Sequence, residues 1–164
     1  MKNYYPLALH NEWHYQQKDG NTYINKVTAA NGQEFTMHNS AANTVSFVRL
    51  MDGQMTTDGL EKGNFQLWLP TDLEVGKNWV VSFKANGLDC LLLMTVKEMD
   101  SSKEVSGKTF NDVVCIEAES QIIMNGSTMQ LNFFTQYYYA EGVGLILTTS
   151  SAGDIHELTS YKLH

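Results

Sequence analysis

The chain has 164 residues, of which 43% are hydrophobic and 11% aromatic, so it can bury a core without disulfide staples. Its formal net charge is −7, and Arg49 is its single arginine. Proteins that bind nucleic acids or anionic membrane surfaces carry clusters of basic residues, so this composition argues against both classes of partner.

Turn signals divide the chain into short segments from beginning to end. Asn-Gly and Asp-Gly pairs favour tight hairpin turns and occur at 19–20, 31–32, 52–53, 86–87 and 125–126. Further turns are predicted at 100–102 and 153–154. In chain order, the segments between them predict strands at 13–18, 22–28, 34–38, 44–50, 64–69, 79–85, 88–99, 113–124, 129–140, 144–150 and 155–162. Pro6 and Pro70 lie outside these segments, as a sheet requires.

This series of strands predicts an all-β fold, an antiparallel meander of about ten strands with little helix. We expect the sheet to curl into a barrel or half-barrel, or to split into a sandwich, so that residues 1–164 form a single barrel-like domain. Helical turns are allowed only near the N-terminus and at 58–62. The segments 91–94 and 133–139 are apolar on both faces, so we expect other parts of the chain, or a second copy, to cover both.

The two cysteines, Cys90 and Cys115, do not form a metal-binding pair. If their strands form one hairpin that turns near 101–107, residue 90 faces a position near 118, which makes a disulfide doubtful. We expect two small buried thiols, although a bulged register leaves the pairing open. The cysteines therefore do not define the redox compartment.

The best candidate for a metal site is the alternating triplet His10, Glu12 and His14, which would share one face of a strand. A polar outer face opposite Trp13 and Tyr15 explains the same pattern, and no fourth ligand is evident. We therefore predict neither a metal nor a cofactor.

Candidates for catalysis are equally sparse. His156 and Glu157 could exchange protons only beside a nucleophile, and the sequence contains no nucleophile elbow. Glu117 and Glu119 share a strand face and could serve a glycosidase only at a defined separation. Solvated carboxylates explain them more simply, so we predict no catalytic residue.

The candidate ligand-binding residues are three consecutive tyrosines, Tyr137, Tyr138 and Tyr139. Alternation along a strand prevents all three from pointing inward, so at least one ring faces the other side, where it could stack on a sugar or contact a partner. Alternatively, the segment 4–9 covers such a ring as a lid. Gly142 and Gly144 follow as turn residues, and no Lys or helix makes them a phosphate loop.

Four landmarks with a particular order and spacing complete the pattern. They are 5–7 with 11–15 (YPL and NEWHY), 70–79 (PTDLEVGKNW), 107–114 (GKTFNDVV) and 138–145 (YYAEGVGL). Over nearly the full chain this arrangement resembles the TapB-like family of exported bacterial proteins of unknown function. The resemblance implies a β-rich, barrel-like domain behind a secretion or lipoprotein signal, with no known reaction. His10 departs from the family, in which glycine is common at that position.

Together these observations predict a non-enzymatic binding or interaction module of the cell envelope. Its partner would be an unknown protein, a glycan or a lipid of the envelope, and the pattern also allows a homo-oligomer. The alternatives are a hydrolase acting on envelope carbohydrate or peptide, and a purely structural assembly component. No run reaches the ~18 apolar residues of a spanning helix. We expect a periplasmic protein or an outer-membrane or cell-surface lipoprotein whose signal is removed from this chain, with a cytoplasmic location as the alternative.

Overall fold

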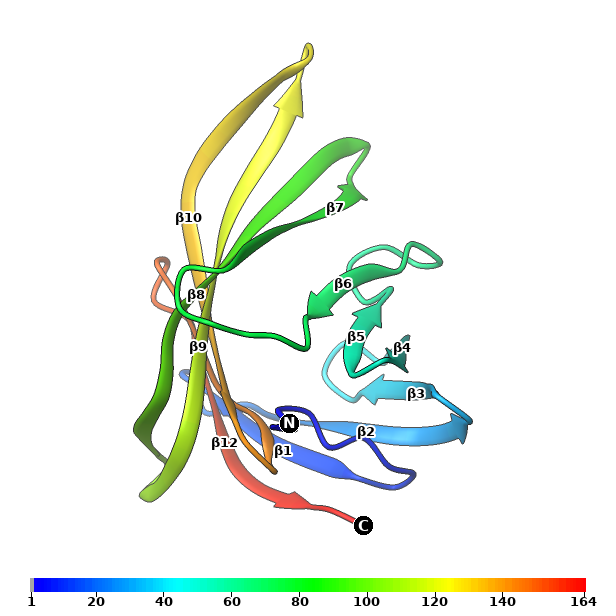
Figure 1. The fold of residues 1–164 in the computed structure, drawn as a ribbon, viewed down its shortest axis with the longest axis vertical. Helices are drawn as coiled ribbons and strands as arrows, with labels where there is room; N and C mark the ends of the chain where they lie inside the picture. The colour runs from blue at the N-terminus through cyan, green and yellow to red at the C-terminus, as the bar shows by residue number, and fades with distance from the viewer. Residues whose placement is uncertain (1) are drawn as a thin grey trace.

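The computed structural model describes residues 2–164, which form a single antiparallel sheet and contain no helix. Figure 1 shows the strands wrapped into a nearly closed barrel, which confirms the predicted fold class. The twelve strands are β1 (Glu12–Gln17), β2 (Thr22–Asn31), β3 (Glu34–Asn39), β4 (Thr44–Met51), β5 (Gln54–Thr57), β6 (Gln66–Leu69), β7 (Asn78–Ala85), β8 (Leu88–Val105), β9 (Lys108–Met124), β10 (Ser127–Ala140), β11 (Gly144–Ser150) and β12 (Ile155–Lys162).

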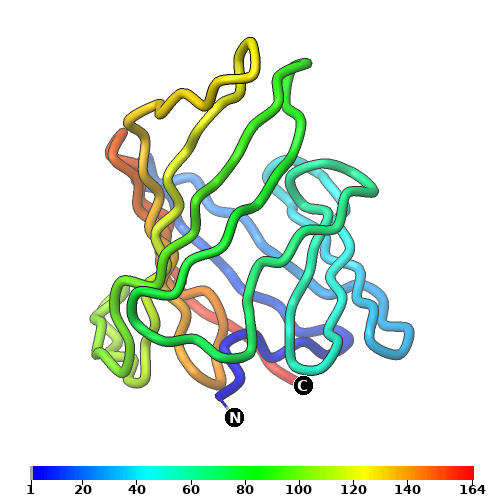
Figure 2. The backbone as a smooth tube through the Cα atoms, turned by 45° about the horizontal axis from the view of Figure 1, so that its top comes forward, coloured from blue at the N-terminus to red at the C-terminus, as the bar shows by residue number. Residues whose placement is uncertain are grey.

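The strand order places the beginning and end of the chain side by side in the wall. It runs β6-β5-β4-β3-β2-β1-β12-β11-β10-β9-β8-β7, so every neighbour in sequence pairs except β6 and β7. The first strand pairs with the last, and Trp13 lies opposite Tyr161. The two free edges, β6 and β7, therefore come from the middle of the chain and face each other across the barrel seam (Figure 2).

Side chains close this seam in place of a strand ladder. The amide of Asn64 donates to the Ser82 carbonyl at 3.0 Å, and the Gln66 side-chain oxygen accepts from the Ser82 backbone N–H at 3.0 Å. One carboxylate oxygen of Glu61 accepts from the Lys84 backbone N–H, also at 3.0 Å. These bonds satisfy backbone groups that an edge strand would otherwise present for pairing with another chain.

Strands β8 and β9 extend well beyond the barrel and form an arm at its lower left in Figure 1. The turn predicted at 100–102 is wrong, because β8 continues to Val105 and the chain reverses at Ser106 and Gly107. Asp100 has a φ of 52°, but it lies in one of three successive register shifts that bend the hairpin. We call residues 98–115 the arm.

The arm packs back against the outer side of the barrel wall. The ammonium of Lys103 lies 4.6 Å from the centre of the Tyr138 ring, and both Val105 and Phe110 are buried. Cys115 on β9 and Leu147 on β11 are buried as well. The arm therefore covers the outer face of the tyrosine-rich strand at Tyr138, whereas Phe133 and Phe134 stay half-buried, so the expected cover on both faces is partial.

Two further differences lie between β4 and β6. The short strand β5 was not predicted, because its four residues carry only one large apolar side chain, Met55. The helical turn allowed at 58–62 is absent, and these residues form a loop. The buried Asp58 organises that loop: its two carboxylate oxygens accept from the backbone N–H groups of Phe47 at 2.8 Å and Gly63 at 3.0 Å.

Candidate functional site

The three consecutive tyrosines of β10 lie in three different environments. Tyr139 is 2% exposed inside the barrel, and its hydroxyl accepts a 2.7 Å hydrogen bond from the indole of Trp68. The half-buried Tyr137 shares the inner face and packs edge-on against Trp68, with ring centroids 5.3 Å apart. Tyr138 faces outward beneath Lys103. The structure thus brings Tyr137 and Tyr139 together through Trp68 and separates Tyr138 from them.

The N-terminal segment closes the lower end of the barrel in the view of Figure 2. It inserts the ring of Tyr5 between Trp13, at a centroid distance of 5.2 Å, and Tyr139, at 6.0 Å. The buried Asn11 fixes the segment, since its amide donates to the Pro6 carbonyl at 2.7 Å. The segment 4–9 therefore contacts the inward-facing Tyr139 from inside the barrel. The lid alternative was wrong about the ring, because it placed the segment over the outward-facing tyrosine, and that ring, Tyr138, lies under Lys103.

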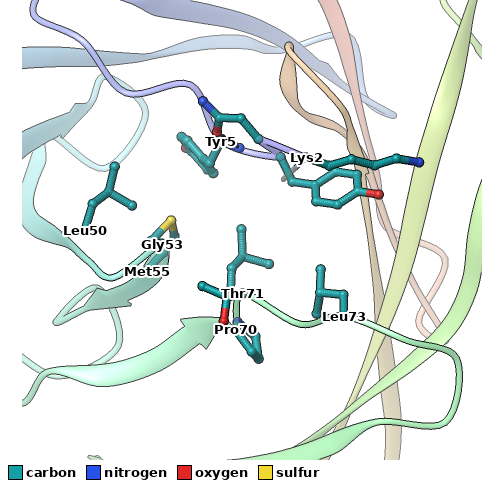
Figure 3. Close-up of a pocket in the computed structure, with 11 residues that line it drawn as sticks. Lys2, Tyr5, Leu50, Gly53, Met55, Pro70, Thr71 and Leu73 are labelled. Atoms are coloured by element: carbon teal, nitrogen blue, oxygen red, sulfur yellow. Dashed lines mark hydrogen bonds between the residues drawn. The ribbon is translucent and has the colours of Figure 1, made fainter.

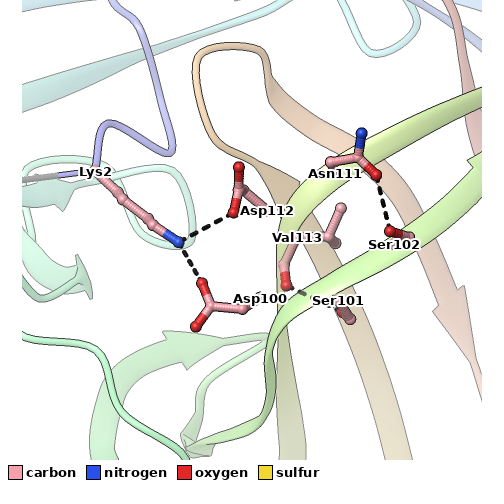
Figure 4. A network of polar contacts seen from close by, with 7 residues as sticks. All are labelled: Lys2, Asp100, Ser101, Ser102, Asn111, Asp112 and Val113. Carbon is pink, nitrogen blue, oxygen red and sulfur yellow. Dashed lines mark hydrogen bonds and ion pairs between the residues drawn. The ribbon is translucent and has the colours of Figure 1, made fainter.

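A second attachment holds the start of this segment against the arm. Figure 4 shows the Lys2 ammonium between two carboxylates, those of Asp100 and Asp112, the latter at 3.3 Å. The hydrogen bond with Asp100 is the main cause of a raised pKa of Lys2. Both aspartates have positive φ values at bends of the arm. The same pair of strands that covers the outside of the barrel thus also holds the segment that closes its end.

The space beside Tyr5 is too small for an organic ligand. Figure 3 shows the pocket beside Tyr5, with Leu50 and Met55 on one side and Leu73 on the other. Its volume is about 50 Å³. One water occupies about 30 Å³ of liquid, so this space can hold water but no sugar or lipid. The hydroxyl of Tyr4 at its border is buried without a hydrogen-bond partner.

Burial keeps the interior hydroxyl groups neutral. Desolvation is the main cause of the raised pKa of Tyr5, Tyr15 and Tyr139, and it also raises the pKa of Tyr23 to about 12. The Tyr15 hydroxyl donates to the Leu145 carbonyl at 2.7 Å. Tyr15, Tyr23 and Tyr139 therefore act as hydrogen-bonded packing elements of the barrel.

The outer surface offers a larger pocket where the tip of the arm meets β12. Its volume is about 440 Å³, and it is open to solvent. Its floor consists of three apolar side chains that are at least nine-tenths buried: Val105, Phe110 and Leu158. Its rim carries Lys108 and Tyr161 together with hydroxyl side chains. We call this site the arm pocket.

Lys108 is held in place over the aromatic groups of the arm pocket. Its ammonium lies 5.3 Å from the Phe110 ring centre and 4.9 Å from that of Tyr161, and it donates to the Tyr161 hydroxyl at 3.2 Å. Lys108 takes part in none of the ion pairs among residues 2–164. No Asp or Glu lines the pocket. In a chain of net charge −7, this pocket is locally positive.

The residues considered for a metal site do not converge. Glu12 and His14 bind each other at 2.9 Å, and Lys26 lies 3.7 Å from the same carboxylate. His10 precedes β1 with a φ of 72° and packs against His164, with ring centroids 6.1 Å apart. Across the part of the chain that the structure describes, no three His, Cys, Asp or Glu side chains gather as metal ligands would.

The residues considered for acid–base chemistry are each engaged separately. His156 shares a 2.6 Å hydrogen bond with the Tyr23 hydroxyl, while Glu157 is the adjacent residue on β12 and so faces the other way. The Glu117 carboxylate accepts from the Gln136 amide at 3.0 Å, and that of Glu119 lies 3.4 Å from the Gln121 amide. Among residues 2–164, none of these groups is hydrogen-bonded to a serine, threonine or cysteine side chain.

Both cysteines are free thiols. Cys90 lies opposite Ile122, and Cys115 lies opposite Glu98, because the long hairpin turns later than the sequence suggests. The expectation of two buried thiols holds for Cys115 and is wrong for Cys90, which is partly exposed. Burial raises the pKa of the Cys115 thiol to about 11.

Sequence reasoning did not find the arm pocket. Lys108 and Phe110 belong to one of the recognised landmarks, but Tyr161 lies 53 positions beyond Lys108. Only the bend of the arm onto β12 brings them together, and no local pattern predicts that bend. The one available signal was a lysine two positions from an aromatic residue, which is common on exposed strands.

Comparison with known proteins supports the fold. Neither a protein-family model nor a curated protein matches the chain, so the resemblance to the TapB-like family stays a prediction. No helix among the described residues has the length and apolar character needed to cross a membrane.

Two solved structures cover almost the whole chain. One is a Bacteroides fragilis protein classed as exported, with a YmcC-like fold: it has a TM-score of 0.59 at 10% identity and covers 99% of this chain and 100% of its own. The other is a Parabacteroides distasonis protein classed as a lipoprotein, with a TM-score of 0.56 at 13% identity over 98% of this chain and 99% of its own. At these identities the likeness shows a shared all-β barrel fold.

Proposed function

We propose that this chain is a non-enzymatic binding module of the bacterial cell envelope that engages its ligand on the outer surface of the barrel. The observation that carries the proposal is the packing inside the barrel, where Tyr5 lies between Trp13 and Tyr139 and the pocket beside Tyr5 has a volume of about 50 Å³. A small-molecule site generally needs roughly 300 Å³ or more. Surface pockets of that size are present, and the arm pocket combines buried apolar lining residues with a cation that takes part in none of the ion pairs among residues 2–164.

An envelope location is supported by the two similar structures, one classed as exported and one as a lipoprotein, and by the landmarks shared with an exported family. A non-enzymatic role is supported by the separation of the acidic and histidine side chains. A hydrolase would need two of them facing one cleft, whereas His156 is bonded to Tyr23 and Glu117 to Gln136.

A purely structural role through edge pairing has less support. The side chains of Glu61, Asn64 and Gln66 already occupy backbone groups of β7 at the seam. Pairing with a second chain at this edge would first have to displace them.

Co-sedimentation with envelope material tests the proposed function. The purified protein would be incubated with peptidoglycan sacculi and with isolated surface polysaccharide, with an unrelated acidic protein as the control for charge. We expect it to sediment with one of these materials, and we expect mass spectrometry of the supernatant to find no released fragments. Release of soluble sugars or peptides would establish a hydrolase, and recovery only in the supernatant would contradict a binding role.

A further inference from the structure

We propose that the arm pocket binds a sugar residue that carries a carboxylate. This inference rests on the proposed function and names the ligand class of its surface site. Three features of the pocket have to be matched by one ligand: a fixed cation, an aromatic and aliphatic surface, and exposed hydroxyl groups.

The cation selects for an anion. Lys108 is without a carboxylate partner, and no acidic side chain lines the pocket. Its ammonium has three N–H donors and uses one on the Tyr161 hydroxyl at 3.2 Å. The remaining donors are available to a ligand carboxylate. The single positive charge of Lys108 balances the one charge of a carboxylate, whereas a phosphate dianion would keep an unbalanced charge in the pocket.

The apolar surface selects for a ligand with a C–H face. Tyr161 is only partly buried, and the buried residues Val105, Phe110 and Leu158 line the same pocket. A sugar ring presents several C–H groups on one face, which pack against an aromatic ring, while its opposite edge stays polar. The pocket volume of about 440 Å³ falls in the range of small-molecule sites.

The hydroxyl groups select against a simple fatty acid. The rim includes the exposed Ser106, Thr159 and Ser160. The Thr159 hydroxyl already donates to the His14 carbonyl at 3.2 Å, which leaves the two serines to bind ligand hydroxyls. An alkyl chain would leave these groups unpaired and would itself stay partly in water, because the pocket is open. A carboxylated sugar satisfies all three features together.

The test is an NMR titration of the ¹⁵N-labelled protein with sodium glucuronate. Glucose serves as the neutral sugar and hexanoate as the acid without hydroxyls. We expect glucuronate to shift the amide signals of residues 105–110 and 158–161 and to bind about tenfold more tightly than either comparison compound. Lys108→Gln should weaken glucuronate binding by about tenfold. Lys103→Gln is the matched control, because Lys103 lies on the same arm but contacts Tyr138 outside the pocket.

Several outcomes would overturn the assignment. They are an absence of shifts at the pocket amides, equal binding of glucose or hexanoate, and equal loss in the Lys108→Gln and Lys103→Gln variants. The amide spectra of both variants establish that each is folded. If glucuronate does not bind while the Lys108→Gln variant still sediments with envelope material, the ligand class is wrong and the proposed function stands. If the wild-type protein binds no envelope material, the proposed function itself fails.

Discussion

The hydroxyl of Tyr139 accepts a 2.7 Å hydrogen bond from the indole N–H of Trp68, a residue 71 positions earlier in the chain. This bond spans the barrel interior from β10 to β6, which is one of the two edges of the sheet. It therefore links strands across the inside of the barrel, just as the Asn64 and Gln66 side chains link the two sheet edges at the seam. An edge strand with only one ladder partner is held to the opposite wall by a polar contact.

Removing this hydroxyl should lower stability measurably. Tyr139→Phe leaves the ring in place but deprives the Trp68 N–H of its partner, so we expect a loss of roughly 1–3 kcal/mol in the free energy of unfolding. Tyr4→Phe is the matched control, because the Tyr4 hydroxyl is also buried but has no hydrogen-bond partner. Its removal should leave stability unchanged or raise it. Chemical denaturation monitored by tryptophan fluorescence measures both, and equal losses would contradict the role of the Trp68 bond.

Gly144 is required where the chain turns from β10 into β11. Its φ is +115°, and an added Cβ would lie 2.9 Å from the indole nitrogen of Trp13, which donates to the Val143 carbonyl at 2.7 Å. Gly144→Ala should therefore combine backbone strain with displacement of a fully buried tryptophan, and we expect a loss of roughly 3 kcal/mol or more.

Gly126 provides the comparison for that variant. It too has a positive φ, +77°, but no atom lies within 4 Å of its would-be Cβ. Gly126→Ala should show the backbone strain alone, roughly 1 kcal/mol. Thermal unfolding by circular dichroism distinguishes the two, and equal losses would show that the Trp13 contact adds nothing.

The sequence was a good guide to whatever depends on local pattern. Asn-Gly and Asp-Gly pairs and alternation located eleven of the twelve strands, because tight turns and pleats are encoded over a few residues. The turn predicted at Asp100 was wrong, because this residue forms part of a bulge within a longer strand. The hairpin partner beyond it, and not the residue itself, decides whether the ladder continues.

The arm pocket and the position of the N-terminal segment 4–9 could not be predicted from the sequence for the same reason. Tyr5 meets Tyr139, and Lys108 meets Tyr161, only after the first and last strands pair and the arm bends back. Those contacts depend on the summed twist of many strands. Alternation along the strand predicts that the tyrosines face two sides of the sheet. It does not predict which segments of the chain cover each side.

The two thiols should differ sharply in reactivity. The thiolate is the reactive form, and burial both shields the Cys115 sulfur and raises its pKa to about 11, whereas Cys90 is partly exposed. At pH 8 we expect iodoacetamide to modify Cys90 first and Cys115 only in denaturant. Peptide mass spectrometry identifies the modified residue. The Cys90→Ser variant should then show no fast phase, and rapid modification of Cys115 in the native protein would contradict its burial.

Alkaline pH should unfold the barrel through its buried tyrosines. Desolvation raises the pKa of Tyr5, Tyr15 and Tyr139 above the value of 10.0 that the unfolded chain approaches. The unfolded state therefore loses these protons first, so stability is complete below pH 10 and declines as the pH rises above it. We expect the tyrosinate absorbance at 295 nm to show an early phase from accessible rings and a late cooperative phase that coincides with loss of the circular dichroism signal. Tyr15→Phe should reduce the late phase by about one tyrosinate, and a gradual titration of all tyrosines before unfolding would contradict the buried interior.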